Sequence, residues 1–187
     1  METTQSSHHM STPARFRSLM ASFPSGVSIV TAVGDGQAPW GMTCSAVCSV
    51  AVDPPTLLVG MRVESPTLAA AVHSGVFAVN LLHARARGYA ELFASADPHR
   101  FGAIRWHRPE GGGGPHLVDA AHTVADCRIT RTVRVAGQRI VFGEVFRITE
   151  LSDTKPLLYG FRGYASWPAA DAESEGEGRE AGASRST

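Results

Sequence analysis

Apolar stretches rich in β-branched residues, each ended by a turn signal, dominate the middle of this chain. The run at 27–33 ends in Gly-Asp-Gly, and the stretch at 42–52 stops at Asp-Pro-Pro. Short apolar runs bounded by glycine, proline or aspartate are typical of β-strands. The sequence therefore predicts strands at 27–33, 42–52, 56–61 and 76–82.

Two longer stretches nearer the carboxyl end alternate polar and apolar residues. In the first, at 123–135, polar Arg128 follows apolar Cys127, and the alternation continues on both sides. The second stretch, at 139–149, begins just after Gly137, a residue suited to a tight turn. This arrangement predicts an antiparallel hairpin.

Helical patterns are few and short. At 16–23 the apolar residues recur at spacings of three and four, which places them on one helix face. Ser65 and Pro66 have the chemistry of an N-cap and a first helical residue, so a helix is expected at 67–72. A third candidate lies at 84–93. Six or more strands with short helices between them predict a closed antiparallel β-barrel rather than an alternating parallel sheet.

Composition divides the chain of 187 residues into three parts. Residues 1–13 are polar and unpatterned, and after Pro168 the chain contains no apolar residue larger than alanine. Such segments cannot bury enough surface to offset their ordering entropy, so we expect both to be disordered. The remaining residues, 14–167, are expected to form one domain.

Charge and cysteine content exclude several classes of protein. The formal net charge is zero, so no basic face for nucleic acid is indicated. Cys44, Cys48 and Cys127 lack the spacing of a disulfide framework or zinc site, and eight histidines show no metal-ligand spacing. No segment has the length and hydropathy of a secretory signal or membrane span. We expect a cytoplasmic protein with reduced thiols, no metal and no membrane or nucleic-acid partner.

The common catalytic and nucleotide-binding motifs are missing from the sequence. It contains no GxSxG elbow, P-loop, HExxH or GxGxxG. The glycine run at 111–114 has neither a predicted strand before it nor a helix after it, so a flexible loop is expected there.

The segment at 42–50 is unusual because small and hydroxyl-bearing residues fill a predicted strand. Such residues bury little apolar area, but they leave the backbone accessible to a flat ligand. Thr43, Ser45 and Ser49 would add hydroxyl groups for hydrogen bonds with that ligand. The same composition fits a strand packed tightly against a neighbouring backbone, and the sequence leaves both interpretations open.

A second candidate site begins where the strand at 56–61 ends. Arg62 lies three residues before Ser65, the expected N-cap, and Thr67 follows in the first turn. Free backbone N–H groups at a helix N-terminus, two hydroxyls and a guanidinium suit an anion. Ordinary N-capping also explains Ser65 without any ligand.

Taken in order, these segments resemble the short-chain flavin reductase family, the reductase components of two-component flavin-dependent monooxygenases. The resemblance covers about 16–167. The matching segments are 16–18, 23–31, 41–50, 53–58, 65–67, 75–80, 100–102, 126–128, 141–145 and 156–159.

The resemblance implies a mostly β fold, a split antiparallel β-barrel, that forms a homodimer with flavin sites at or near the subunit contact. Carried over by position, residues near the flavin ring and ribityl chain would be Ser25, Met42, Thr43, Cys44, Ser45, Ala46, Val47, Cys48 and Ser49. Ser65 and Thr67 would hold the phosphate beside Arg62, and Phe101 would stack near the flavin. Tyr159 and Arg162 would lie near the nicotinamide nucleotide. Gln138 occupies a place where relatives often carry histidine.

The function implied by the resemblance is that of an NAD(P)H:flavin oxidoreductase, which supplies reduced FAD or FMN to a partner monooxygenase. Hydride passes between the two nucleotides, so no catalytic side chain is expected. FAD is expected over FMN, and NADH over NADPH because no compact arginine cluster marks a 2′-phosphate pocket. The alternatives are a flavin- or haem-binding storage or sensing protein and a barrel without a ligand.

Overall fold

The computed structural model describes residues 11–95 and 97–167. The expectations of disorder at 1–10 and 168–187 lie outside the described residues. The elements are α1 (Pro13–Ala21), β1 (Ser25–Gly26), β2 (Ser28–Val33), η1 (Asp35–Gln37), β3 (Pro39–Cys44), β4 (Val47–Val52), β5 (Pro55–Arg62), α2 (Pro66–Ser74), β6 (Val76–Leu82), α3 (Arg87–Ala94), η2 (Arg100–Ala103), β7 (Ala121–Val135), β8 (Gln138–Glu150), β9 (Leu157–Gly160) and β10 (Gly163–Ser166).

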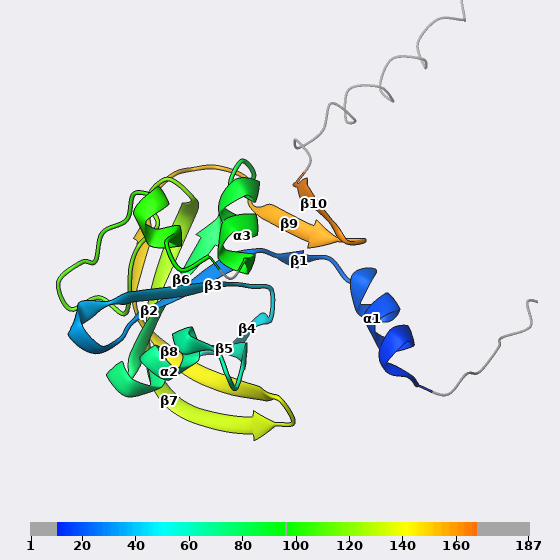
Figure 1. The fold of residues 1–187 in the computed structure, drawn as a ribbon, viewed down its shortest axis with the longest axis horizontal. Coiled ribbons are helices and arrows are strands. Elements are labelled where there is room, and N and C mark those ends of the chain that lie inside the picture. The colour runs from blue at the N-terminus through cyan, green and yellow to red at the C-terminus, as the bar shows by residue number, and fades with distance from the viewer. Residues whose placement is uncertain (1–10, 96, 168–187) are drawn as a thin grey trace, which may run out of the picture.

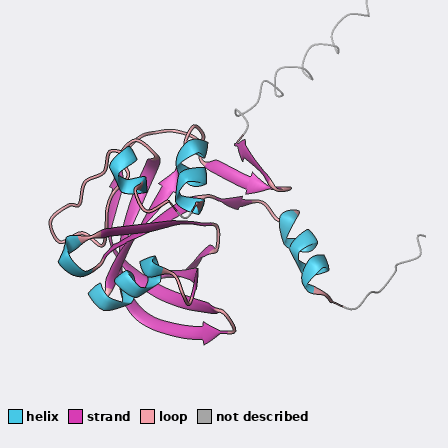
Figure 2. Ribbon diagram, viewed as in Figure 1, coloured by secondary structure: helices cyan, strands magenta, loops and turns pink. Residues whose placement is uncertain are grey.

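Strands are the main regular elements of the fold, and short helices lie around them (Figure 2). Seven strands form one antiparallel sheet in the order β3-β2-β6-β7-β8-β5-β4, and a second sheet has the order β1-β9-β10 (Figure 1). The expected β7–β8 hairpin is present, with Ala136 and Gly137 at its turn.

The two edges of the larger sheet are neighbours in the chain. β3 is one edge and β4 the other, yet only Ser45 and Ala46 separate them. Three Cα steps span at most about 11 Å, so the sheet must curl until its edges meet. Gly60 N–H donates to Ala46 O across this junction. We call residues Cys44, Ser45 and Ala46 the seam.

This topology confirms the mostly β, antiparallel split barrel and corrects two details. β3 and β4 do not pair among the described residues, so the barrel is not closed as the pattern alone predicted, and one predicted strand is divided in two. The segment at 42–52 was expected as one strand, but the structure breaks it at the seam. The prediction was wrong here because the residue pattern reports strand tendency alone. It carries no information about which partners the two halves pair with. β3 pairs with β2, whereas β4 pairs with β5.

The barrel interior and its two ends are filled by two main groups of buried side chains. One lies between the sheet and α2 and includes Val59, Met61 and Phe77. The other lies beneath α3 and includes Phe93 and Leu117. Gly143 is required in the first group, because a Cβ there would lie 2.5 Å from the Phe77 ring.

The helices differ in how far they are buried. α2 follows the sequence prediction: the Ser65 hydroxyl accepts the Leu68 N–H, and Gly75 ends the helix in the left-handed region at φ 73°. α1 has the expected apolar face but no buried residue. Phe16 is 57% exposed and Leu19 64%. In Figure 1, α1 stands to one side of the barrel.

The glycine run at 111–114 is packed, which corrects the expectation of a flexible loop. Residues 112–117 are buried against the sheet. A Cβ on Gly114 would lie 2.5 Å from Thr31 O, and one on Gly113 would overlap Phe77 O. Here glycine serves close approach of two backbones rather than flexibility.

Candidate functional site

Two cavities lie along this part of the chain, one beside the β3 residues that precede the seam and one beside Ser45 and Ala46 of the seam. The first, which we call the α2 cavity, has a volume of about 500 Å³. Its wall comes from β3, the start of α2, the end of α3 and η2. The lining residues are Gly41, Met42, Thr43, Arg62, Glu64, Ser65, Pro66, Thr67, Phe93, Ala94, Ser95 and Arg100.

The α2 cavity has the chemistry of an anion site. Arg62 and Arg100 both line it, against one carboxylate, that of the exposed Glu64. Thr67 is 2% exposed, and its hydroxyl has no hydrogen-bond partner among the described residues. The N-terminus of α2 adds the Thr67 N–H and a favourable dipole, since Pro66 has no N–H and the Leu68 N–H is bonded to Ser65. A phosphate fits this set of donors.

N-capping and anion binding share the start of α2. The Ser65 hydroxyl accepts the Leu68 N–H at 3.5 Å and donates to Met42 Sδ at 3.2 Å. Thr43 donates its hydroxyl to Ala90 O at 2.6 Å, so that proton is committed to α3. Only the lone pairs of the Thr43 oxygen remain for a ligand, which differs from the donor role expected from the sequence.

Arg100 is a cavity residue that the sequence analysis missed. Its Nη1 donates to Ser95 O at 2.9 Å, and its guanidinium lies 5.9 Å from the centre of the Phe93 ring. These contacts hold the charge beside the cavity before any ligand binds. The signal that could have found it is its place next to Phe101 in a segment that matches the family.

The second cavity, which we call the α1 cavity, has a volume of about 570 Å³ and a largely apolar wall. It lies between α1, β4, β5 and the turn that follows β9. The lining residues are Phe16, Arg17, Met20, Ala21, Phe23, Ser25, Ser45, Ala46, Val47, Cys48, Leu58, Gly60, Ile140, Tyr159 and Arg162. A flat aromatic ring fits such a wall.

The structure brings most of the predicted site residues to one of the two cavities. The α2 cavity contains Met42, Thr43, Arg62, Ser65 and Thr67. The α1 cavity contains Ser25, Ser45, Ala46, Val47, Cys48, Tyr159 and Arg162.

Four predicted residues line neither cavity. Cys44 is 5% exposed in the core, where burial raises the pKa of its thiol to about 11. Ser49 is exposed on β4. Phe101 packs edge-on against Phe93, behind the α2 cavity wall. Gln138 is exposed at the start of β8, paired with Arg62. The seam therefore combines both interpretations of the small-residue strand: tight packing at Cys44, and cavity walls beside it.

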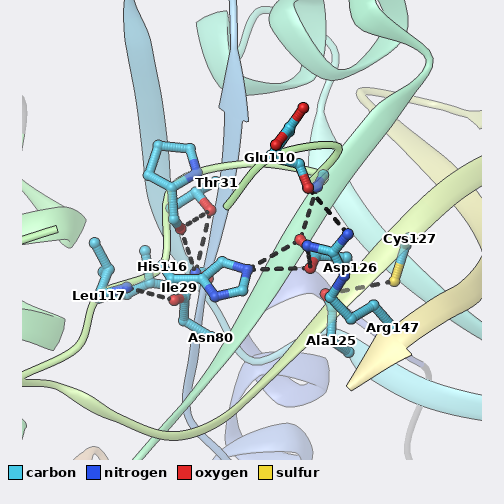
Figure 3. Close-up of polar contacts among 12 residues, drawn as sticks. Ile29, Thr31, Asn80, Glu110, His116, Leu117, Ala125, Asp126, Cys127 and Arg147 are labelled. Carbon is cyan, nitrogen blue, oxygen red and sulfur yellow. Dashed lines mark hydrogen bonds and ion pairs between the residues drawn. The ribbon is translucent and has the colours of Figure 1, made fainter. Parts of the chain in front are cut away.

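A buried polar network lies apart from both cavities (Figure 3). His116 Nε2 is 3.0 Å from Asp126 Oδ1, and Gly113 N–H donates to the same oxygen at 2.7 Å. Arg147 Nη1 lies 3.9 Å from Asp126 Oδ2. His116 Nδ1 has no hydrogen-bond partner among the described residues. Sequence spacing did not reveal this pair, which anchors the glycine run.

A curled antiparallel sheet with an anion cavity and an apolar cavity at one seam defines a β-barrel protein suited to a nucleotide. The chain belongs to the flavin reductase-like family: the family model described as "Flavin reductase like domain" matches residues 20–168. The family and the split-barrel fold expected from the sequence are thus confirmed.

Individual relatives agree with this assignment. The chain is 46% identical over 156 residues to a flavin reductase (NADPH) of Lentzea aerocolonigenes, with coverage of 83% of this chain and 91% of the relative. It is 30% identical over 151 residues to the reductase subunit of a flavin-dependent monooxygenase of Rhodococcus jostii, covering 81% and 75%.

A solved structure shows the same fold. An NADH:FAD oxidoreductase of Streptomyces globisporus C-1027, in complex with NAD and FAD fragments, superposes with a TM-score of 0.79 at 26% identity. The match covers 89% of this chain and all of that one. Among the residues that the structure describes, no helix has the length and hydropathy to cross a membrane.

Proposed function

We propose that this chain is an NAD(P)H-dependent flavin reductase that transfers hydride from a reduced nicotinamide nucleotide to FAD or FMN. The observation that carries the proposal is the pair of cavities at the seam. One suits a phosphate and the other suits a flat ring. A flavin nucleotide has both groups at the two ends of one flexible chain. Membership of the family supports the same activity.

The flavin phosphate is assigned to the α2 cavity. Arg62 and Arg100 balance its charge. The N–H and the free hydroxyl of Thr67, in the first turn of α2, donate to phosphate oxygens. The ring is assigned to the α1 cavity, against the small residues Ser45 and Ala46. Without bulky side chains there, the backbone of the seam can contact the ring edge.

The protein's contribution to hydride transfer is positioning. Bound flavin supplies the acceptor atom, N5, for hydride from C4 of the nicotinamide. The apolar wall formed by Phe16, Met20 and Phe23 restricts water around the stacked rings. Holding two rings at reactive distance replaces a bimolecular encounter by an intramolecular step. No acid or base is needed for this transfer.

Two further parts of the proposal concern assembly and place of action. Leu19, Val52 and Phe161 are 64%, 87% and 80% exposed, and β4 is a sheet edge with both faces uncovered. Apolar surface of this kind supports a homodimer, with α1 and β4 covered by the second copy. A monooxygenase that takes up the reduced flavin is supported by the Rhodococcus relative. All three cysteines are free, which supports a cytoplasmic location.

The experiment that tests the function is anaerobic turnover. Purified protein is mixed with NADH or NADPH and with FMN or FAD, and loss of nicotinamide absorbance is followed. We expect multiple turnovers with at least one combination. A protein that retains a coloured flavin but oxidises neither nucleotide would instead be a storage or sensing protein.

A matched pair of variants tests the phosphate assignment. Thr67→Val keeps the shape of the side chain but removes the hydroxyl. A hydrogen bond to a charged group contributes about 1.5 kcal/mol, so the KM for flavin should rise about tenfold. Thr130→Val, on β7 and lining neither cavity, should leave that KM unchanged. Equal KM values for the two variants would contradict the assignment.

A further inference from the structure

The α1 cavity contains two arginines that the sequence keeps far apart. Arg17 comes from α1 and Arg162 from the turn between β9 and β10. No aspartate or glutamate lines this cavity. Among the described residues, neither guanidinium has an ion pair or hydrogen bond, whereas Arg87 and Arg105 are paired with Glu91 and Asp119. Two unpaired cations at the rim of an apolar cavity favour an anionic ligand with a flat ring.

The backbone holds the two arginines in place relative to each other. Phe161 and Arg162 both occupy the left-handed region, at φ 48° and 61°, where residues with a side chain are rare. Phe161 and Arg162 are the two loop residues between the paired Gly160 and Gly163, and a tight two-residue hairpin loop commonly has positive φ at both positions. Phe161 N–H donates to Ala21 O, the last residue of α1. This bond joins the turn of Arg162 to the helix of Arg17.

The flavin phosphate does not account for this second pair of arginines. The α2 cavity already supplies Arg62, Arg100 and the start of α2 for that group. The remaining anionic reactant is the reduced nicotinamide dinucleotide, whose ring must stack on the flavin in the α1 cavity. We propose that Arg17 and Arg162 bind a phosphate group of this dinucleotide and thereby determine donor affinity. The inference rests on the proposed function.

This assignment changes the expectation about the donor. NADH was expected over NADPH because the sequence shows no compact arginine cluster. The fold brings Arg17 of the first helix and Arg162 of the last hairpin to the wall of one cavity. The phosphate held there is either the diphosphate that both nucleotides carry or the 2′-phosphate of NADPH, and the two sources give different kinetics.

The test compares Arg17→Gln and Arg162→Gln with Arg15→Gln, which lies on the same helix but does not line the cavity. Steady-state KM and kcat are measured with NADH and with NADPH at saturating flavin. Each cavity variant should raise the donor KM about tenfold while kcat and the flavin KM stay near wild-type values. A higher KM for both donors assigns the diphosphate, and a higher KM for NADPH alone assigns the 2′-phosphate.

A second measurement does not depend on turnover. Binding of oxidised NADP⁺ and NAD⁺ to the flavin-loaded protein is measured by calorimetry, and each cavity variant should weaken it by the same factor as the KM. Arg17→Lys should restore part of the affinity, since the charge is kept. If the wild-type enzyme is active and the cavity variants keep its donor KM and affinity, the inference is overturned and the proposed function stands. Inactivity of the wild-type enzyme with both donors would overturn the proposed function.

Discussion

Asp126 is a buried carboxylate with several polar contacts. It accepts hydrogen bonds from Gly113 N–H and His116 Nε2 and lies near the Arg147 guanidinium. Each of these contacts comes from a different part of the chain: the glycine run, the segment after it, and β8. The side chain therefore fixes the 112–117 segment onto β7.

Removing this carboxylate should destabilise the fold strongly. Asp126→Ala leaves a buried N–H and a buried imidazole without partners, at a cost of about 3 kcal/mol in the free energy of unfolding. Urea denaturation followed by circular dichroism gives the value. Asp153→Ala, at an exposed residue, is the control and should change it by less than about 0.5 kcal/mol. A loss below 1 kcal/mol for Asp126→Ala, roughly a surface effect, would refute the account.

Single residues were the hardest part of the site to predict from sequence. Ser65 and Thr67 could be found because a helix start has a local signature. Arg17 and Arg162, or His116 and Asp126, become neighbours only when distant segments pack. Nothing in their local spacing marks them, since the pairing is a property of the fold. The sequence analysis accordingly found the phosphate end of the site from a local signal. It placed Arg162 near the nicotinamide nucleotide only through the family resemblance, and it missed Arg17.

At the scale of elements, the glycine run shows that one sequence pattern is compatible with either a flexible loop or a tightly packed one. Four successive glycines indicate flexibility when only local propensity is considered. Here Gly113 and Gly114 lie against backbone oxygens of Phe77 and Thr31 at distances that exclude a Cβ. The glycines therefore allow this loop to pack directly against the backbones of β6 and β2.

A pair of glycine variants tests this conclusion. Gly113→Ala should lower the free energy of unfolding by about 3 kcal/mol, because the added methyl overlaps fixed backbone. Gly88→Ala in α3 meets nothing within 4 Å and should instead raise it by about 0.5 kcal/mol through helix propensity. The melting temperatures of both variants, measured by thermal denaturation, test this expectation. Equal melting temperatures would show that the run is loose after all.

Most elements were predicted because each has a local cause. Five of the strands and the start of α2 follow from β-branched runs, turn residues and an N-cap. The break of 42–52 at the seam was missed, because it depends on which strand each half pairs with. The packing of α1 was also beyond reach: its apolar face is correct, but no residue of α1 is buried among the residues that the structure describes.

At the scale of the whole molecule, the exposed apolar surface makes the state of assembly a sharp prediction. Light scattering during size exclusion should give twice the chain mass. Leu19→Asp and Val52→Asp each place a charge on the uncovered surface of α1 or β4 and should shift the protein towards the monomer. Ser18→Asp, on α1 beside Leu19, is exposed and polar already and serves as the control. A wild-type monomer would overturn the homodimer.

The seam gives the barrel a property that its topology alone does not require. Ser45 and Ala46 are the link between β3 and β4, and the same residues border the proposed ring site. A nucleotide that binds only when β3 and β4 lie close together would stabilise that arrangement of the two edge strands. By mass action it would slow the opening of that junction in proportion to its saturation. The empty enzyme would then exchange its seam amides with solvent faster than the loaded one, and substrate supply would set how long the protein survives a protease.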